Sequence, residues 1–567
     1  MAEVALRREI LSLYENQTFT RESRKTARNI MSAKFIYKWK LIDGVKTIKA
    51  RMTIRGFQDL AGATLETFAS TASRWSQRCI VSCAAQRSWK LFMFDVSVAF
   101  LQGLTFSELS ENQGTVEREA CFDPPPGTAQ YFKELKGLES FNTVHEVFRM
   151  LKAIYGLCDA PRAWQLKLQQ SLKRAGGQQL HTDRNIWVWF RLSQLVMVLS
   201  THVDDLKGCG ESAEVERLRL HLTAEFGKLK EAYDTFVHCG IEHETDHKAK
   251  TVRLHQNAYI KQIKLFDNVI LAALKPEAPL TSRMSELYNS LLGALSWLTQ
   301  TRLDIAIYVV ALQRAAKAPH SEHAQRLQRI AKWVKRRESS LLFAFLANPV
   351  RIVAISDSAF RKEDTQGLAI RGAIIALVDS MFGPDALGGR VHILEYFSRK
   401  QRRVTRSTFS AELNALSDAI DIGRLIALLF SELLRPYPSA SALVKLEEQG
   451  RFVIELQAVV DAKSVFDAIA APEIKTPTEV SLVMRLCAVK EALSCRCLSR
   501  LWWCSTGDMI ADGLNKGAVS RAKLIEFAST GIWHLEKPAI GHSERVHVPI
   551  ESSAASQVIQ ELHRASA

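Results

Sequence analysis

Two apolar segments that end in carboxylates constrain the fold of this chain more than any other feature. Residues 91–94 run into Asp95, and residues 195–203 run into Asp204 and Asp205. Neighbouring side chains of a strand face opposite ways, so the adjacent acids shortly before Gly208 predict a tight hairpin turn. An Asp after a strand is most often a turn or capping residue, so position and order together must support any chemical role.

A second set of acids occurs in the C-terminal part of the chain. Asp357 and Asp461 each follow an apolar strand. Glu412 lies on the predicted helix 411–433, and Asp512 comes after a short loop. A few carboxylates at rigid strand ends suffice to hold Mg²⁺, which prefers oxygen ligands. The two sets therefore predict two sites where metal ions stabilise the attacking and leaving oxygens of phosphodiester chemistry.

Length and charge are consistent with such chemistry. The chain has 567 residues, 47% of them apolar and 24% charged, a globular composition that predicts about three or four units. Lys and Arg number 75 against 60 Asp and Glu, so the formal charge is +15. This surplus attracts polyanions such as nucleic acids, although a basic enzyme with another substrate would also carry it.

Other classes of protein are excluded by the same sequence. The longest apolar runs fall far short of the ~20 residues of a membrane span, and the N-terminal residues lack the apolar core of a signal peptide. Ten cysteines are too sparse for a disulfide framework, and no Cys/His spacing of a zinc module is present. The sequence therefore predicts a reduced intracellular protein without structural zinc.

A basic segment precedes the first acid. Lys49, Arg51 and Arg55 alternate with the apolar residues Ala50 and Met52. This period of two predicts a half-buried strand that presents basic side chains in a row on one open face. A solvated edge strand, whose charges discourage aggregation, would show the same pattern.

The spacing of apolar residues in the rest of the sequence indicates three further segments. Residues 159–176 predict a loop followed by an amphipathic helix. Residues 288–345 have helical apolar spacing interrupted at Pro319, and the second helix of this stretch is basic, with Arg326, Arg329, Lys332, Lys335 and Arg336. From Arg351, three strands, a long helix, a strand, a helix and a further strand predict a mixed α/β unit.

Short motifs occur around the acids in a fixed order. They are Lys49-Ala50-Arg51, Arg55-Gly56-Phe57, Glu66-Thr67-Phe68, the run from Asp95 to Gly103, Tyr155-Gly156-Leu157, the run from Ala160 to Trp164, Val203-Asp204-Asp205, Gly293-Ala294-Leu295, the run from Thr301 to Ile305, and the run from Ala511 to Lys516. This ordered set resembles the reverse transcriptase and ribonuclease H portion of a copia-type LTR retrotransposon Pol polyprotein. The resemblance runs almost continuously from about Glu9 to about Lys516.

The resemblance implies a multidomain fold of the α+β and α/β classes. It comprises a right-hand polymerase of fingers, palm and thumb, followed by a ribonuclease H-like mixed-sheet domain. We expect fingers and palm at residues 1–275, a thumb- or connection-like helical segment at 276–349, the ribonuclease H-like domain at 350–535 and a tail of unclear structure at 536–567. The implied enzyme is an RNA-directed DNA polymerase that also cleaves the RNA strand of RNA–DNA hybrids.

The resemblance also assigns roles to the acids and basic residues. Two Mg²⁺ ions, with Mn²⁺ as an alternative, would be held at each of two catalytic carboxylate sets, which are Asp95, Asp204 and Asp205 in the palm and Asp357, Glu412, Asp461 and Asp512 in the ribonuclease H-like domain. Lys49 and Arg51 would reach the incoming dNTP, and Phe100 would be the aromatic gate that excludes a ribose 2′-OH.

The implied partners are an RNA template, a DNA primer, their hybrid and dNTPs, with no membrane. The implied compartment is a cytoplasmic particle, the nucleus or both, on the pathway to DNA integration. The sequence shows no capsid-like region, aspartic-protease motif or integrase zinc module. We therefore expect either a piece of a longer polyprotein or a truncated gene.

Six positions depart from the family pattern. Four of them are Leu303 in place of Pro, Ser410 and Leu413 in place of Glu and Tyr beside Glu412, and Asn515 in place of Thr. Asp159 replaces the usual Gln and would place a negative charge near the nucleotide, whereas His202 replaces the usual Tyr and would weaken primer positioning. None of these departures removes a predicted metal ligand. Three hypotheses stay open: an active polymerase with ribonuclease H, a degenerate or domesticated copy that binds nucleic acid without polymerising, and a protein in which only ribonuclease H is active.

Overall fold

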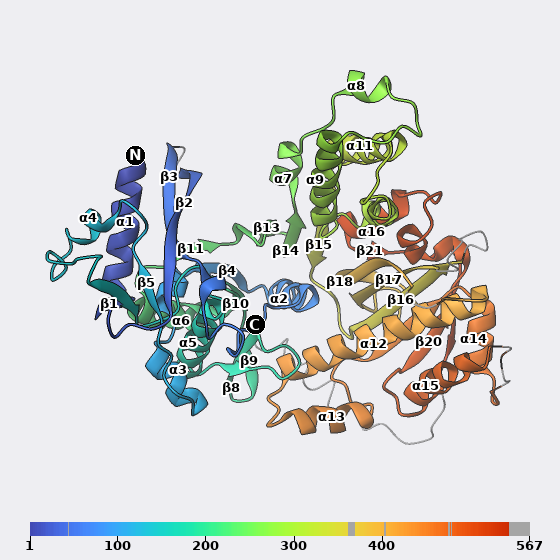
Figure 1. Cartoon of the computed structure of the whole chain (residues 1–567). Helices are drawn as coiled ribbons and strands as arrows, with labels where there is room; N and C mark the ends of the chain where they lie inside the picture. Colours follow the sequence, from blue (N-terminus) through green and yellow to red (C-terminus); the bar gives the residue numbers. More distant parts are fainter. Residues whose placement is uncertain (43–44, 361–368, 402–403, 475–476, 478, 544–567) are drawn as a thin grey trace.

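Four β-sheets and the helices around them make up the chain (Figure 1). The structure is a computed structural model that describes residues 1–42, 45–360, 369–401, 404–474, 477 and 479–543. Its architecture is a mixed α/β arrangement of several units, which confirms the predicted fold class. Within the described residues, no helix combines the length and apolar character that crossing a bilayer requires.

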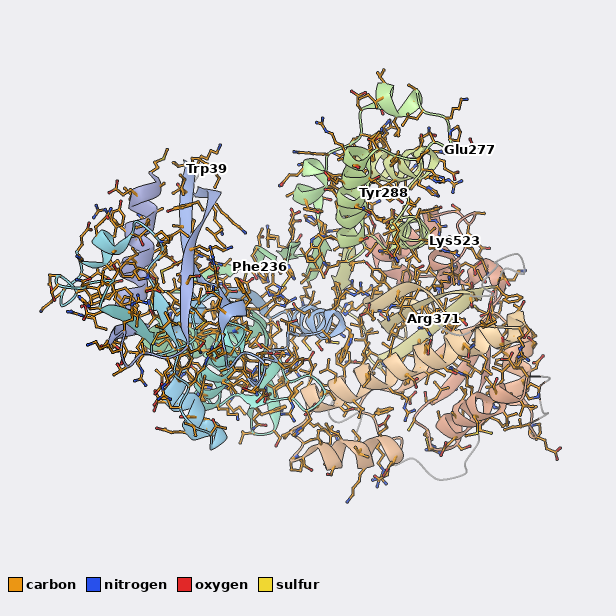
Figure 2. All side chains as sticks on the ribbon, viewed as in Figure 1. Trp39, Phe236, Glu277, Tyr288, Arg371 and Lys523 are labelled. Atoms are coloured by element: carbon orange, nitrogen blue, oxygen red, sulfur yellow. The ribbon has the colours of Figure 1, made fainter. Side chains whose placement is uncertain are left out.

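The N-terminal unit is a five-stranded sheet whose core is rich in phenylalanine. Its strands, in spatial order, are β1 (Phe19–Ser23), β6 (Glu146–Met150), β5 (Cys121–Asp123), β2 (Ile30–Ile42) and β3 (Val45–Ile54). Helix α1 (Ala2–Glu15) packs on β3 through Leu6, Ile10 and Leu13, which recur at helical spacing. Short helices α3 (Phe106–Gln113) and α4 (Ala129–Phe132) complete the unit. The β2–β3 hairpin projects from it, with Trp39 exposed towards its outer end (Figure 2).

The next unit is a six-stranded antiparallel sheet that carries the first set of acids. Its order is β11 (Lys230–Tyr233), β4 (Lys90–Asp95), β10 (Asp205–Gly210), β9 (Gln194–His202), β8 (Ile186–Arg191) and β7 (Gln178–Gln179). Helix α2 (Arg74–Arg87) shares a core with one face, whereas α5 (Ala160–Arg174) and α6 (Ser212–Phe226) share a core with the other. The predicted strands at 91–94 and 195–203 and the predicted helix after Pro161 are confirmed.

A four-stranded sheet and a helical bundle follow. The sheet runs β12 (Thr235–His238), β13 (Ile241–Asp246), β14 (Thr251–His255) and β15 (Leu341–Ala344). Between β14 and β15 the chain forms α7 (Asn257–Gln262), α8 (Asn268–Ala272), α9 (Ser282–Leu298), α10 (Ala306–Gln313) and α11 (Ser321–Arg336). The prediction of helix up to residue 345 is wrong, because Leu341 and Phe343 are buried with a period of two and β15 pairs with β14. This sheet contains strands from both sides of the predicted domain boundary at residues 275/276. That boundary remains a prediction.

The C-terminal unit is built on a seven-stranded mixed sheet. Its order is β21 (Ile532–Trp533), β18 (Gly389–Lys400), β17 (Ile370–Val378), β16 (Arg351–Ala359), β19 (Leu456–Val460), β20 (Arg500–Trp503) and β22 (Ile540–His542), with β16, β19 and β20 parallel. Helix α12 (Thr408–Leu434) packs across β16, β17 and β19. The other helices are α13 (Ala440–Glu448), α14 (Lys463–Ala470), α15 (Val483–Ser494) and α16 (Ala522–Thr530). Strand β22 lies within the segment expected to be a tail, and residues 544–567 lie outside the described residues.

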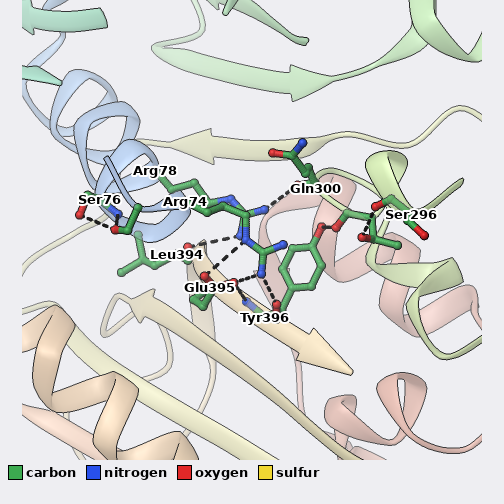
Figure 3. A network of polar contacts seen from close by, with 10 residues as sticks. Arg74, Ser76, Arg78, Ser296, Gln300, Leu394, Glu395 and Tyr396 are labelled. Carbon is green, nitrogen blue, oxygen red and sulfur yellow. Dashed lines mark hydrogen bonds and ion pairs between the residues drawn. The ribbon is translucent and has the colours of Figure 1, made fainter. Parts of the chain in front are cut away.

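The six- and seven-stranded sheets are joined by polar contacts between α2 and β18 (Figure 3). Arg74 forms an ion pair with Glu395 and donates to the carbonyl oxygen of Tyr396 at 2.6 Å. Arg78 donates to the carbonyl oxygens of Leu394, at 3.3 Å, and Gln300. These contacts lie over one continuous apolar core that includes residues of α2 and of the seven-stranded sheet.

Candidate active sites

The first three predicted carboxylates lie where the end of β4 adjoins the start of β10, two interior strands of the six-stranded sheet. Asp95 ends β4, and Asp205 begins β10 directly opposite it in the antiparallel register. Paired residues of neighbouring strands present their side chains on the same face. Asp204 lies in the turn, directly after Val203, whose φ is 60°. The carbonyl oxygen of Asp204 accepts a hydrogen bond from the backbone N–H of Val96 at 3.1 Å. The predicted hairpin is therefore confirmed.

The electrostatics of this first cluster favour a bound cation. Partial burial, together with the charges of Asp204 and Asp95, raises the pKa of Asp205 to about 6. Lys230 on β11 places its Nζ 3.2 Å from Oδ2 of Asp95. Sequence reasoning missed this lysine, which lies 135 residues away from its partner. Its side chain is 71% exposed, so its ammonium group can leave the acids without disturbing any packing.

The predicted basic strand is β3 of the five-stranded sheet. Lys49 and Arg51 are exposed on β3, whereas the alternate residues Ala50 and Met52 are buried, as the period of two predicts. Partial burial and the charge of Arg51 lower the pKa of Lys49, and Lys230 adds to the same shift. Because Lys230 also contacts Asp95, this basic face of β3 extends towards the carboxylates.

Tyr155 connects the residues expected to contact a dNTP. The Arg51 guanidinium lies 4.7 Å from the centre of the Tyr155 ring, and the Phe100 ring centre lies 5.7 Å from it. Burial raises the pKa of Tyr155 to about 12, and the charge of Asp204 contributes to this shift. The structure therefore brings Arg51 and Phe100 together beside the acids through a tyrosine to which the sequence assigned no role.

Two of the sequence motifs pack against each other at this point. Gly156 has φ 98°, and a Cβ there would lie 2.1 Å from the carbonyl oxygen of Ile54. A Cβ on Gly56 would lie 2.2 Å from the carbonyl oxygen of Gly156. Only glycine permits this approach, and the Ile54 N–H donates to the Tyr155 carbonyl oxygen at 2.8 Å. The end of β3 is thereby fixed against the segment that carries Tyr155.

Asp159 does not present the free negative charge that the sequence led us to expect. Its side chain is buried and forms an ion pair with Arg118, which also pairs with the fully buried Asp59. The charge of Asp159 is therefore partly compensated, because Arg118 is shared with Asp59 and the three groups keep one net negative charge. Arg118 lies 41 residues from Asp159, and no local sequence signal connects the two.

His202 lies on β9 opposite Asp205 in the strand register. Its ring centre is 6.2 Å from that of His238, and its buried Nδ1 has no hydrogen-bond partner in the described part of the chain. Burial lowers its pKa, against the opposing charge of Asp204. Burial therefore favours the neutral form of the ring.

The second set of acids meets at the centre of the seven-stranded sheet. Asp357 lies on β16, Asp461 directly follows β19, and Asp512 lies in the short 3₁₀ helix Ile510–Leu514. Each offers a carboxylate oxygen, and these atoms all lie within 4.8 Å of one another. Glu412 on α12 joins them, because its Oε1 accepts the backbone N–H of Ser358 at 3.2 Å. The structure thus brings together all four residues predicted for this site.

A glycine on β17 lets the 3₁₀ helix approach the sheet. A Cβ on Gly372 would lie 2.7 Å from the Cβ of Leu514 and 3.1 Å from the carbonyl oxygen of Ala511. Gly372 pairs with Asp357 across β17 and β16. The missing side chain therefore leaves the space in which Asp512 reaches Asp357.

Burial and mutual repulsion shift the pKa values of the carboxyl groups in this second cluster. Burial, followed by the charges of Asp357 and Asp461, raises the pKa of Glu412. Burial, followed by a hydrogen bond with Asp357, raises the pKa of Asp512. Burial opposes ionisation of Asp357 as well, but contacts with Asp512 and Lys516 outweigh it and lower its pKa. Asp357 is therefore the member that holds negative charge most readily.

Two residues next to Asp512 complete the cluster. Lys516 Nζ lies 3.0 Å from Oδ2 of Asp357 and 2.6 Å from Oδ1 of Asp512. Asn515 Nδ2 donates to Oδ2 of Asp357 at 2.7 Å. In the sequence, both residues stand out only as members of the motif at 511–516. The spacing of four between Asp512 and Lys516, which brings side chains together on a helix, is the one signal that could have indicated their contact.

The donor atoms of the second cluster fit a divalent metal ion, whereas Asp95, Asp204 and Asp205 do not bring three carboxylate oxygens equally close together in the described part of the chain. In the second, Asp357 Oδ1 and Glu412 Oε2 are buried without a hydrogen-bond partner among the described residues. Unsatisfied carboxylate oxygens that converge in this way are the hard ligands that Mg²⁺ prefers. In the first, the mutual repulsion that raises the pKa of Asp205 would be relieved by a cation. The chain thus carries one buried acidic triad with the geometry of a metal site and a second group of acids paired across β4 and β10.

Comparison with known proteins relates part of the chain to a known family. Residues 16–273 match a family model described as reverse transcriptase (RNA-dependent DNA polymerase). The match covers both the basic strand and the first acid cluster, and it confirms that this part of the chain resembles reverse transcriptases. The second cluster lies outside the matched residues, so its resemblance to ribonuclease H stays a prediction.

Three similar curated proteins are retrovirus-related Pol polyproteins of plant transposons. Those of transposons RE1 and RE2 of Arabidopsis thaliana are 26% and 25% identical, over 70% and 68% of this chain. That of transposon TNT 1-94 of Nicotiana tabacum is 23% identical over 58% of it. The matches cover 26%, 25% and 25% of the three relatives, so the chain spans about a quarter of their length.

Among solved structures, the chain is similar to a foamy viral protease–reverse transcriptase in complex with double-stranded DNA. The identity is 12% and the TM-score is 0.45, with 84% of this chain and 66% of that chain covered.

Proposed function

We propose that the chain is an RNA-directed DNA polymerase of a retrotransposon that also cleaves the RNA strand of RNA–DNA hybrids. One observation carries the polymerase part of the proposal. Asp95 and Asp205 are paired across β4 and β10 with Asp204 in the adjoining turn, inside the residues that match the reverse transcriptase model. In this proposal, the five- and six-stranded sheets are fingers and palm, and the bundle from α9 to α11 is the thumb.

The first cluster would bind the metal ions of nucleotidyl transfer through Asp95, Asp204 and Asp205. When bound there, two divalent ions stabilise the charge on the attacking and leaving oxygens. The chain's own residues position the substrate. Lys49 and Arg51 supply positive charge to the triphosphate from β3. Phe100, packed against Tyr155, closes the site on the side of the sugar.

The second cluster would cleave the RNA strand of a hybrid. Asp357 and Asp512 are the carboxylates best placed to hold a metal ion, and Asp461 lies within the same distance of both. Glu412 has a raised pKa, so it holds a proton in the absence of metal and can exchange it with bound water. Lys516 lies between Asp357 and Asp512 and would be displaced from them, or would neutralise the phosphate, as the hybrid enters.

The proposed partners are an RNA template, a DNA primer and dNTPs. The exposed basic residues Arg329, Lys335 and Arg336 of α11 would follow the phosphates of the template–primer duplex. The same proposal includes a longer polyprotein in which these activities operate. The curated relatives are about four times as long as the matched segment.

A copy that binds nucleic acid without polymerising is the alternative. The observation in its favour is His202, whose ring favours the neutral form and whose buried Nδ1 has no partner in the described part of the chain. The second ground for this alternative has weakened, because the charge of Asp159 is partly compensated by Arg118.

Primer extension on a homopolymer RNA template distinguishes the two functions. We expect the full chain to extend an annealed DNA primer with the complementary dNTP when Mg²⁺ or Mn²⁺ is present, and not when EDTA is added. The exposed Asp246, far along the chain from both clusters, provides the control variant Asp246→Asn, which should extend like the wild type. Hybrid binding without extension under any metal condition would establish the alternative.

A further inference from the structure

A cavity of about 510 Å³ lies between the helical bundle and the C-terminal unit. Its walls include the aliphatic side chains of Ile305, Leu312 and Ile330 and the aromatic rings of Tyr308 and Trp333. Cavities of roughly 300–1,000 Å³ with mostly apolar walls are typical of sites for small organic molecules. Neither carboxylate cluster contributes a residue to this one.

The cavity also has a strongly positive rim. Arg326 and Arg329 of α11 supply its exposed charge. Arg521, just before α16, lines the cavity as a buried side chain that already donates to Tyr308, Gly513 and Lys516. Arg329 has no ion-pair or hydrogen-bond partner among the described residues, and Arg326 pairs only with the exposed Glu322 on its own helix. A ligand with a negative group at the rim would therefore gain charge-assisted hydrogen bonds without breaking a buried pair.

The wall is held rigid by a motif that the proposed function does not use. Arg302 and Asp304, from the run between Thr301 and Ile305, form a fully buried ion pair with two nitrogen–oxygen contacts of 2.8 and 2.7 Å. Trp333 donates its Nε1–H to the same Asp304 at 3.1 Å. The indole ring is therefore fixed in the wall, so the cavity is preformed rather than dependent on the occupant.

Arg521 connects the cavity with the second acid cluster. Its Nε donates to the Tyr308 hydroxyl at 3.1 Å, and its Nη2 donates to the carbonyl oxygen of Lys516 at 2.6 Å. Tyr308 in turn donates to the carbonyl oxygen of Gly517 at 2.8 Å. The two cavity residues Tyr308 and Arg521 thus hold the backbone of the segment that follows Asp512.

We propose that this cavity binds a small aromatic anion, and that binding further stabilises residues 513–517 through Tyr308 and Arg521. The aliphatic and aromatic walls match an apolar ring system, and the arginine rim matches one carboxylate, sulfonate or phosphate group. A nucleobase suits the cavity less well, because its polar edges would meet few hydrogen-bond partners between Ile305, Leu312 and Ile330.

Binding of 8-anilinonaphthalene-1-sulfonate to the full chain tests the site. By isothermal titration and fluorescence, we expect one molecule per chain. Ala311 is exposed and lines the cavity, so Ala311→Trp should fill it and raise Kd by about tenfold or more. Arg329→Glu should raise Kd by a similar factor, because it reverses the charge of the rim.

Two matched variants control for general effects of size and charge. Ala318 and Arg336 are exposed and do not line the cavity. Ala318→Trp and Arg336→Glu should therefore leave Kd within about twofold of the wild type. Equal losses in the control and cavity variants, or several equivalent binding sites, would show that the probe adsorbs to the surface and would overturn the proposal.

Hydrogen–deuterium exchange tests the connection to the acid cluster without any activity assay. On addition of the probe, we expect slower amide exchange in peptides that cover residues 513–517 in the wild type. The same peptides should show no change in the Ala311→Trp variant. Unchanged exchange in the wild type at saturating probe would contradict the connection through Tyr308 and Arg521.

Discussion

The two carboxylate clusters of this chain use the same kind of side chain in different surroundings. The first lies at the turn between β9 and β10, beside the end of β4, and its cationic neighbour, Lys230, is 71% exposed. The second lies between a central strand, a helix and a 3₁₀ helix, and its cationic neighbour, Lys516, contacts two buried acids. The cation beside the first cluster is therefore free to move away, whereas the second cluster is closed by an internal cation.

The largest expected effect separates the two clusters by function. Asp204→Asn should lower DNA synthesis by about 100- to 1,000-fold, because it removes a carboxylate from the first centre, while hybrid cleavage persists. Glu412→Gln should have the opposite pattern. Primer extension and cleavage of a labelled hybrid measure both. Loss of both activities in either variant would mean that the clusters do not act independently, and Glu448→Gln on the exposed surface of α13 is the matched control.

The next effect compares the two lysines in the absence of metal. Lys516→Met should lower the free energy of unfolding by about 2 kcal/mol, because it leaves buried acids without their cation. Lys230→Met should change it by less than about 0.5 kcal/mol, because that pair is exposed. Urea denaturation in EDTA measures both. Equal effects of the two substitutions would remove this distinction between the two cations.

Metal ions and pH sharpen the comparison further. The pKa of Asp205 is raised to about 6, so the folded state binds more protons than the unfolded state between about pH 4 and 6. Without metal, this carboxyl group therefore contributes stability below about pH 4 that is lost as the pH rises to about 6. Mg²⁺ needs the ionised form, so its stabilisation should be larger at pH 8 than at pH 5.

At 10- to 100-fold excess over Kd, we expect Mg²⁺ to add about 1–3 kcal/mol at pH 8. Thermal unfolding with Mg²⁺, and with NaCl at equal ionic strength, provides the measurement and its control. A shift in Tm that is the same at both pH values would indicate that the ion does not bind through these carboxylates.

The smallest effect concerns Asp159, a carboxylate that shares a buried cation with Asp59. Asp159 is paired with Arg118, so Asp159→Gln should leave the apparent KM for dNTP within about twofold of the wild type. Steady-state primer extension, well below the Tm of the variant, measures this. A clearly lower KM would mean that Asp159 repels the triphosphate in spite of Arg118.

Local patterns allowed much of the fold to be predicted from the sequence. The alternation around Lys49, the hairpin at Asp204 and the apolar strand before Asp357 each depend on residues close together in the chain. The missed features depend on distant ones. Arg118 forms an ion pair with Asp159, 41 residues away. Residues 341–344 form a strand despite the helical spacing around them, because they pair with β14. The charge of Lys230 on Asp95 likewise arises only when β11 and β4 become neighbours.

The continuous core that links α2 with the seven-stranded sheet affects how such a chain can be shortened. Ile80 and Cys83 of α2 share this core with Val391 and Ile393 of β18. A deletion that removes everything before residue 350 would leave the α2-covered face of β18 in contact with water, where exposed apolar surface promotes aggregation. A fragment that begins at residue 350 should therefore aggregate more readily than the full chain, because the two parts share one interior.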